Sequence, residues 1–216
     1  MNIIGSSIAF IISVVASYLV GAIPTSFIFA RALKGLDIRQ VGSKNAGATN
    51  VFRSVGKMAG IATLIIDILK GVLVVTLMAQ FIYAFVGDVD YDFFQVFLGF
   101  AAVCGHVWPI WLGFRGGKGV STSVGALLAI SWLAVLFGVV VWVTVFLLTR
   151  YVSAASLAAA VMLPFGHIIS GATRHHAVVT PTLGLLVLLS ALVVYRHRSN
   201  IQRLRAGTEY RFGSPH

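Results

Sequence analysis

The chain has 216 residues, of which 58% are apolar and 10% are charged, and its mean hydropathy is +0.95. Soluble domains are about 25% charged and about half apolar, so these values exclude a soluble enzyme, a disordered tail and a secreted scaffold. They indicate an integral membrane protein. Sixteen Lys and Arg against six Asp and Glu leave a net charge of +10, and we expect these cations to lie in loops that meet anionic partners.

The apolar stretches predict membrane-spanning helices, because a single span needs about 20 residues. The stretches cover residues 7–30, 67–86, 93–111, 120–149, 151–172 and 177–195. The first 30 residues contain no Lys or Arg, so we expect a first transmembrane helix with its N-terminus outside rather than a cleaved signal peptide. The stretch 120–149 would be about 45 Å long as one helix, so it is either strongly tilted or a tight hairpin of two short helices.

Charge decides between these two alternatives. Segment 31–57 holds six cations and the tail from Arg196 holds five, whereas the acidic segment 88–92 holds none. Both basic segments are expected on the cytoplasmic side, which requires an even number of crossings between them and therefore a hairpin near residues 131–135. The sequence thus predicts an all-α membrane protein forming a single domain over residues 1–216, with seven transmembrane helices, a cytoplasmic C-terminus and no soluble domain.

The first polar segment, residues 42–53, has the sequence GSKNAGATNVFR. Its glycines allow successive backbone N–H groups to point into one concavity, and Ser43 and Asn45 add side-chain donors. Arg53 offers a planar fork for a phosphate. The segment therefore suits an anion site, although a flexible loop whose cations only fix the topology would have a similar composition.

The second polar segment runs from Gly105 to Gly119 and contains GHVWP and GFRGGKG. It fails the nucleotide-binding P-loop pattern, because Leu112 stands at the first glycine position and Gly119 at the Ser/Thr position. What remains is a Gly-rich connection in which backbone amides and Lys118 can approach an anion. The alternative is a tight turn that needs glycines to bring two helices together.

The third polar segment, residues 196–209, begins with RHRSNIQRL and ends with Gly-Thr-Glu. If the last helix continues into it, His197, Asn200 and Leu204 lie on one face. A polybasic tail that binds lipid headgroups explains Arg196, Arg198 and Arg205. It does not explain His197 and Asn200, which are therefore candidate functional residues.

Asp67 and Lys70 lie in an apolar stretch, where an unpaired charge costs about 3 kcal/mol. We expect them to form a structural ion pair at the cytoplasmic boundary, with the span beginning near Asp67. His167 is expected in the core, bonded to a neighbouring helix, and His175 with His176 in a solvated outer turn.

Together these segments resemble the PlsY family of bacterial membrane acyltransferases, which use acyl phosphate and glycerol 3-phosphate. The resemblance runs nearly end to end, through GAIPTS at residues 21–26, DILKG at 67–71 and the three polar segments. Two positions depart from the family pattern: Lys44 stands where glycine is common and Ser199 where glutamate is common. The family's seven-helix topology with the N-terminus outside agrees with the topology predicted from charge.

The resemblance implies a site in the cytoplasmic segments where acyl phosphate and glycerol 3-phosphate react to give lysophosphatidic acid and inorganic phosphate. It implies a multi-pass protein of the bacterial inner membrane, with the active site on the cytoplasmic side. Besides these substrates and the lipid bilayer, we expect no nucleic acid, obligate protein partner, cofactor or metal. By the same resemblance, the residues expected to hold phosphate are Ser43, Asn45, Arg53, Gly116, Gly117, Lys118 and Gly119. His197 and Asn200 are expected near the reacting groups, and the predicted catalytic set is Ser43, Arg53, His197 and Asn200.

The chemistry is compatible with this composition. An acyl phosphate already carries a good leaving group, so the protein must mainly position two anions and offset their repulsion. His197 or a phosphate oxygen of the substrate would accept the proton of the attacking hydroxyl. No His has Asp five residues after it and no Gly-x-Ser-x-Gly occurs, so we predict direct transfer without an acyl-enzyme and without acyl-CoA or acyl carrier protein. A transporter would carry ionisable residues on both faces, whereas the basic residues here are concentrated on one side.

Overall fold

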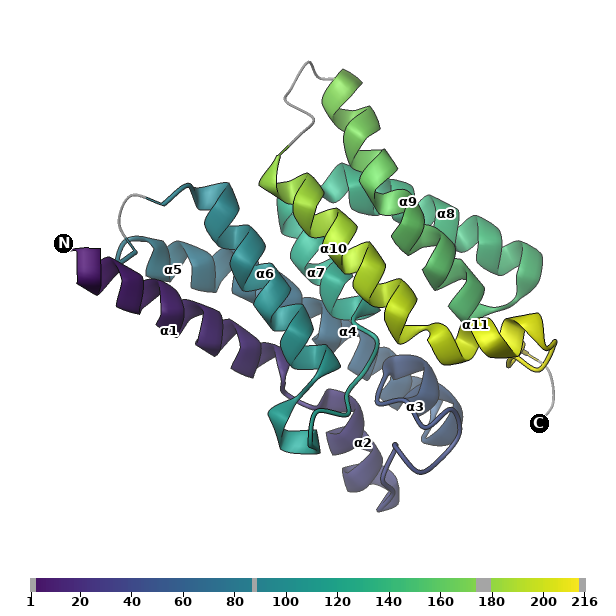
Figure 1. Ribbon diagram of the computed structural model, residues 1–216. Coiled ribbons are helices and arrows are strands. Elements are labelled where there is room, and N and C mark those ends of the chain that lie inside the picture. The colour runs from purple at the N-terminus through teal and green to yellow at the C-terminus, as the bar shows by residue number, and fades with distance from the viewer. Residues whose placement is uncertain (1–2, 87–88, 174–179, 214–216) are drawn as a thin grey trace. The chain divides into compact units, whose positions relative to one another are not determined.

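The computed structural model describes residues 3–86, 89–173 and 180–213, and every regular element within these ranges is a helix (Figure 1). This confirms the all-helical prediction. The chain divides into two compact units, residues 1–130 and 131–216. The single-domain organisation stays a prediction.

The first unit is built from helices of very different lengths. Its described elements are α1 (Ile3–Gly21), α2 (Thr25–Lys34), α3 (Ala48–Ser54), α4 (Lys57–Leu73), the π-helical segment η1 (Val74–Met78), α5 (Ala79–Tyr83), α6 (Tyr91–Val107), the 3-10 turn η2 (Ile110–Leu112) and α7 (Val120–Ile130). The short helix α3 lies within the first polar segment, and the connection from η2 to α7 contains the Gly-rich motif.

The first predicted span is not one helix, which corrects the sequence-based expectation. Helix α1 ends at Gly21 and α2 begins at Thr25 (Figure 1). Pro24 lacks a backbone N–H and its ring crowds the carbonyl one turn earlier, which disfavours a continuous helix at this point. The Lys70 ammonium donates to the Ile23 carbonyl at 3.1 Å, which supplies a donor at the break.

The helix that contains the second predicted span begins before that span. The span was expected to start near Asp67, which stays a prediction, and α4 begins at Lys57, directly after Gly56. The helix then continues through η1 and α5 to Tyr83. The predicted apolar stretch covered only the later part of α4, because the first turns of the helix carry glycine, alanine and threonine as well as large apolar residues.

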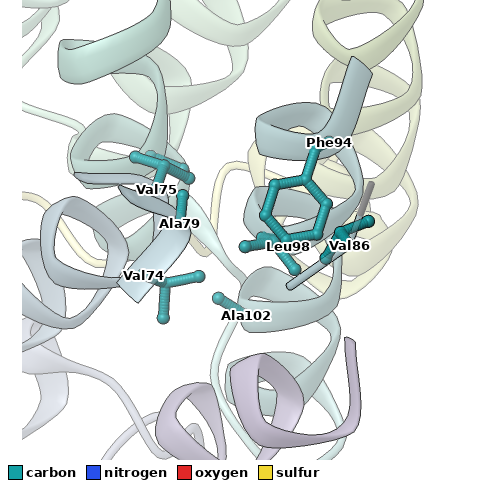
Figure 2. Packing of buried hydrophobic residues seen from close by; sticks show 8 residues of the cluster. Val74, Val75, Ala79, Val86, Phe94, Leu98 and Ala102 are labelled. Atoms are coloured by element: carbon teal, nitrogen blue, oxygen red, sulfur yellow. The ribbon is translucent and has the colours of Figure 1, made fainter. Parts of the chain in front are cut away.

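Buried side chains from η1, α5 and α6 form the main apolar cluster of the first unit. Val74, Val75, Phe94 and Leu98 are fully buried within it, together with Ala102 (Figure 2). The extra residue of a π turn changes the direction in which successive side chains point. Here the adjacent Val74 and Val75 are both directed into protein rather than one of them outward.

Glycines bring the helices of this unit into backbone contact. A Cβ on Gly125 of α7 would lie 2.0 Å from the Ile68 carbonyl oxygen of α4, and one on Gly71 of α4 would lie 2.4 Å from the Thr122 carbonyl oxygen. Helices in lipid gain no hydrophobic free energy by associating with each other, so small residues and close packing stabilise their contacts. The contact between α4 and α7 fits this rule.

We therefore expect Gly125→Ala to reduce the free energy of unfolding by about 1–3 kcal/mol, because the helices must separate to admit the methyl group. Thermal unfolding of the detergent-solubilised protein measures this change. Gly184→Ala in α10 is the matched control, since no atom lies within 4 Å of its added Cβ and its φ is not positive. If Gly125→Ala unfolded at the temperature of the control, the close contact between α4 and α7 would be wrong.

The second unit contains α8 (Trp132–Thr149), α9 (Val152–Thr173), α10 (Pro181–Arg196) and α11 (Arg198–Arg205). The break between α7 and α8 at Ser131 confirms that residues 120–149 are not one continuous helix. His167 of α9 is hydrogen-bonded to Ser131 through Nδ1 at 3.1 Å and to Thr180 through Nε2 at 3.2 Å. Thr180 is the N-cap of α10, so the predicted bond from His167 to a neighbouring helix is confirmed. The predicted outer turn at His175 and His176 lies outside the described residues.

Within the described residues, five helical stretches are long and apolar enough to cross a membrane: Gly5–Lys34, Lys57–Tyr83, Tyr91–Leu112, Trp132–Thr149 and Val152–Ala172. Two shorter apolar helices, Val120–Ile130 and Pro181–Arg196, accompany them. Large exposed side chains on these helices are mostly apolar, including Ile11, Phe81 and Leu148. Apolar surfaces of this extent suit contact with lipid rather than with water.

Candidate functional site

Asn50 organises the first polar segment, although no role was predicted for it. Its side chain is buried, with 2% exposure. The amide Nδ2 donates to the carbonyl oxygens of Ile38 and Val41, both at 3.0 Å, and of Asn45 at 3.1 Å. Its Oδ1 accepts the backbone N–H of Ser43 at 3.1 Å. One side chain thus closes the loop that carries Ser43 and Asn45.

The same loop places Arg53 on a helix. The backbone at Gly47 is extended, and α3 begins at Ala48, so Arg53 comes one turn after Asn50 in the last turn of this short helix. Ser43 and Arg53 are therefore tied to one framework, the first through its backbone N–H and the second through the helix. A rigid framework of this kind is what holding a phosphate group requires.

Lys44 occupies a backbone conformation that favours glycine. Lys44 adopts a left-handed backbone with φ of 56°. Glycine reaches this region without steric cost, whereas a residue with a Cβ loses about 1–2 kcal/mol there. The glycine expected here from the resemblance would suit this backbone, and the loop keeps its left-handed turn with lysine.

Asn50→Asp is expected to reduce the free energy of unfolding by about 3 kcal/mol, since a buried carboxylate oxygen would replace the amide that donates to three carbonyls. Thermal unfolding in detergent measures the loss. Ser54→Ala is the control, because the Ser54 hydroxyl donates to Asn50 Oδ1 at 3.3 Å and its removal is expected to cost about 1 kcal/mol. Equal stability of the two variants would contradict the organising role of Asn50.

The Gly-rich segment folds back on the end of α6. The backbone N–H of Gly116 donates to the Val107 carbonyl at 3.2 Å, and that of Gly117 donates to the His106 carbonyl at 3.1 Å. These bonds place Gly116 and Gly117 in a tight turn, as in the second of the two interpretations of this segment drawn from the sequence. Gly119 has φ of 86° and directly precedes α7, whose first N–H groups have no acceptor within the helix. The N–H groups at the start of α7 are therefore better placed to meet an anion than those of Gly116 and Gly117.

The first two polar segments border one hollow in the first unit. Ala46 of the first segment lines it together with Gly116 and Gly117 of the second. The rest of the lining comes from the break after α1 and from the end of α6: Gly21, Ala22, Ile23, Pro24, Thr25, Ser26, His106, Pro109 and Leu112. Segments about 70 residues apart in the chain are thereby brought to the same place.

Two of these lining residues, Thr25 and His106, belong to a buried ionic cluster. The carboxylate of Asp67 accepts a hydrogen bond from the Thr25 hydroxyl at 2.6 Å and pairs with the Lys70 ammonium at 2.9 Å. The Nδ1 atom of His106 lies 3.7 Å from the same carboxylate oxygen. The pairing with Lys70 confirms the sequence-based expectation, whereas Thr25 and His106 were not predicted as partners.

In the second unit, His197 and Asn200 are both buried, with 3% and 4% exposure. The last helix does not continue unbroken: α10 ends at Arg196, His197 forms the junction, and α11 begins at Arg198. The His197 Nδ1 atom is hydrogen-bonded to the Val193 carbonyl at 2.8 Å. A carbonyl oxygen only accepts, so Nδ1 carries the proton.

Glu209 anchors this part of the second unit, and no role had been predicted for it. Its Oε1 accepts hydrogen bonds from Asn200 Nδ2 at 2.7 Å and from the Ser153 hydroxyl at 3.0 Å. Its Oε2 accepts from Arg203 Nε at 2.8 Å. The polar spacing within α11 pointed to Asn200, but the partner across the following turn could not be identified from that spacing.

The predicted site residues thus fall into two groups. Ser43, Asn45, Arg53 and the segment 116–119 belong to the first unit, while His197 and Asn200 belong to the second. Their meeting in one site stays a prediction.

The chain is similar to a family of known proteins over almost its whole length. A family model described as glycerol-3-phosphate acyltransferase matches residues 11–207. The glycerol-3-phosphate acyltransferase of Desulforamulus reducens is 39% identical over 93% of this chain and 94% of its own length. That of a Synechococcus species is 41% identical over 91% and 92%.

Solved structures show the same similarity in three dimensions. The crystal structure of PlsY, an integral membrane glycerol 3-phosphate acyltransferase, in its glycerol 3-phosphate form superposes with a TM-score of 0.82 at 38% identity, covering 94% of this chain and 96% of that chain. Its lysophosphatidic acid form gives a TM-score of 0.77 at 37% identity, with 94% and 95% covered.

Proposed function

The chain belongs to the glycerol-3-phosphate acyltransferase family, and on that premise we propose that it transfers a fatty acyl group from an acyl phosphate to the sn-1 hydroxyl of glycerol 3-phosphate. The products are lysophosphatidic acid and inorganic phosphate, as in the first acylation of phospholipid synthesis. The protein is an integral membrane acyltransferase. The acyl phosphate donor and the roles of individual residues are the content of the proposal.

The observation that carries the proposal is the shared hollow of the first unit. Two segments border it: the one that carries Ser43 and Arg53 does so through Ala46, and the one that carries Lys118 does so through Gly116 and Gly117. Both substrates are phosphorylated, so two anions must be held close to one another and their repulsion offset. One basic segment suffices for a single phosphate, and the presence of two supports a pair of anionic substrates.

The second unit supplies the proposed proton acceptor. Neutral His197 donates its Nδ1–H to the Val193 carbonyl in a hydrogen bond. Nε2 is therefore the basic nitrogen, which would take the proton of the attacking hydroxyl. A phosphate oxygen of the substrate is the alternative acceptor, and His197 with Asn200 would then orient the hydroxyl or the carbonyl. In either case the acyl group moves directly between substrates, and phosphate leaves.

For the membrane arrangement we propose seven spans, with the N-terminus outside and the C-terminus cytoplasmic. The five long apolar helical stretches and the two shorter apolar helices support this number. The basic residues of segment 31–57 and of the tail support a cytoplasmic location for the active site in the bacterial inner membrane. A hairpin between α7 and α8 satisfies both arguments.

Phosphate release from a synthetic acyl phosphate, followed with and without glycerol 3-phosphate, tests the proposed reaction in the purified protein. We expect release to depend on glycerol 3-phosphate and lysophosphatidic acid to form in equal amount. Acyl-CoA in place of acyl phosphate should give no product. Turnover with the thioester, or a covalent acyl adduct on the protein, would contradict the proposal.

A further inference from the structure

The ionic cluster around Asp67 has no part in the proposed chemistry, yet it is buried almost completely. The side chains of Asp67 and Lys70 have exposures of 1% and 5%. Burying charges costs free energy even when they are paired, so an ion pair of this kind is poor evidence for stability alone. The cluster also joins three elements, because Thr25 belongs to α2, Asp67 and Lys70 to α4, and His106 to α6.

His106 connects this cluster to the Gly-rich segment. Its Nδ1 faces the Asp67 carboxylate at 3.7 Å, and its side chain is only 7% exposed. On the opposite side of the ring, a Cβ on Gly117 would lie 2.1 Å from Nε2, 2.9 Å from Cε1 and 3.0 Å from Cδ2. The Gly117 backbone therefore rests directly on the imidazole ring, and the residue that follows it is Lys118.

We propose that His106 is a positioning residue for the segment 116–118, and that Asp67 fixes the orientation of the His106 ring. The inference rests on the proposed function, in which this segment delivers Lys118 and the start of α7 to a phosphate group. A carboxylate facing Nδ1 attracts the proton to that nitrogen and limits rotation of the ring. Thr25 and Lys70 hold the carboxylate in turn, so the cluster sets the surface on which the loop lies.

The contact gives a specific test, because all three of the nearest obstacles to a Cβ on Gly117 are atoms of the His106 ring. Gly117→Ala is expected to reduce kcat/KM for acyl phosphate about tenfold or more, since it pushes the segment away from the ring. Removing the ring makes room for the methyl group. The double variant His106→Ala/Gly117→Ala should therefore be at least fivefold more active than Gly117→Ala alone, a coupling of about the size expected for residues in contact.

Gly116→Ala provides the matched control. A Cβ at Gly116 would lie 2.2 Å from the His106 carbonyl oxygen and 2.4 Å from Pro109 Cδ, and neither atom is removed by His106→Ala. We expect no rescue of Gly116→Ala by the second substitution. Asp67→Asn should lower kcat/KM in the wild-type background. In the His106→Ala background, the fold-change in kcat/KM caused by Asp67→Asn should be less than half as large, because Asp67 acts through the ring.

Three results would overturn the inference: no rescue of Gly117→Ala, equal rescue of Gly116→Ala, or full additivity of Asp67→Asn with His106→Ala. Thermal unfolding of the same full-length variants gives a second measure of the coupling, including for a variant that folds poorly. The wild-type protein separates the two hypotheses. If the wild-type protein released no phosphate from acyl phosphate, the proposed function would fail. The contact between His106 and Gly117 would still be supported if the double variant unfolded at a higher temperature than Gly117→Ala. If the double variant showed no such rise, the contact would be overturned.

Discussion

Replacing His197 with asparagine is expected to lower turnover about 100-fold or more while the protein remains folded. An asparagine amide nitrogen can take the place of Nδ1 and donate to the Val193 carbonyl, so the backbone junction between α10 and α11 is retained. The Nε2 atom is lost, and with it the proposed proton acceptor. The measurement is kcat with both substrates saturating, together with the thermal unfolding temperature.

His197→Gln is the companion variant. Its amide reaches the position of Nε2 but offers no donor at Nδ1, so it can orient a substrate group without serving as a base. If His197 orients the hydroxyl and a substrate phosphate accepts the proton, glutamine should retain more activity than asparagine. If His197 is the base, both variants should lose activity to the same extent. Wild-type activity in His197→Asn would contradict either role.

Arg53→Lys is expected to lower kcat/KM for the phosphorylated substrates about 10- to 100-fold, although the charge is conserved. Arginine offers a planar fork that binds two phosphate oxygens at once, whereas lysine offers a point charge on a flexible stem. Arg53 lies on α3 one turn after Asn50, whose side chain ties the preceding loop to this helix. Steady-state kinetics with each substrate varied in turn measure the loss and show which phosphate Arg53 serves.

Arg31→Lys is the matched control, because Arg31 is an exposed cation of the same unit that donates only to the nearby Gly35 carbonyl among its described bonds. It should leave kcat/KM within about twofold of the wild-type value. A protein that binds lipid headgroups through nonspecific charge would tolerate both exchanges. Equal kinetics of Arg31→Lys and Arg53→Lys would therefore remove Arg53 from the site.

The parts of the fold that follow from total apolarity and charge could be predicted from the sequence. The helical class was predicted from the apolar stretches. The interruption near Ser131 was predicted because 30 apolar residues exceed one untilted span and because two basic segments on the same side require an even number of crossings between them. The break at Pro24 was missed because the surrounding residues are apolar, and hydropathy does not register the lost N–H of proline. The π turn at residues 74–78 leaves no trace in composition, although its residues Val74 and Val75 join the buried cluster.

The candidate site divides along similar lines. Asp67 and Lys70 could be paired from sequence because they lie three residues apart on one helix. Thr25 and His106 are about 40 residues away on either side, so only the packing of α2 and α6 against α4 reveals them. Asn50 and Glu209 stood in recognised motifs, but their roles depend on backbone carbonyls and a turn whose geometry the residue types do not specify.

The break in the first helical stretch bears on how the chain enters the membrane during synthesis. The second stretch brings a carboxylate and an ammonium into an environment that disfavours both, and each finds a partner in residues already made: the hydroxyl of Thr25 and the carbonyl of Ile23. The earlier segment thus supplies hydrogen-bond partners for the later one. These two charges can be bonded before the C-terminal half of the chain has been synthesised. Insertion in chain order becomes energetically feasible because the ligands of the charged residues precede them.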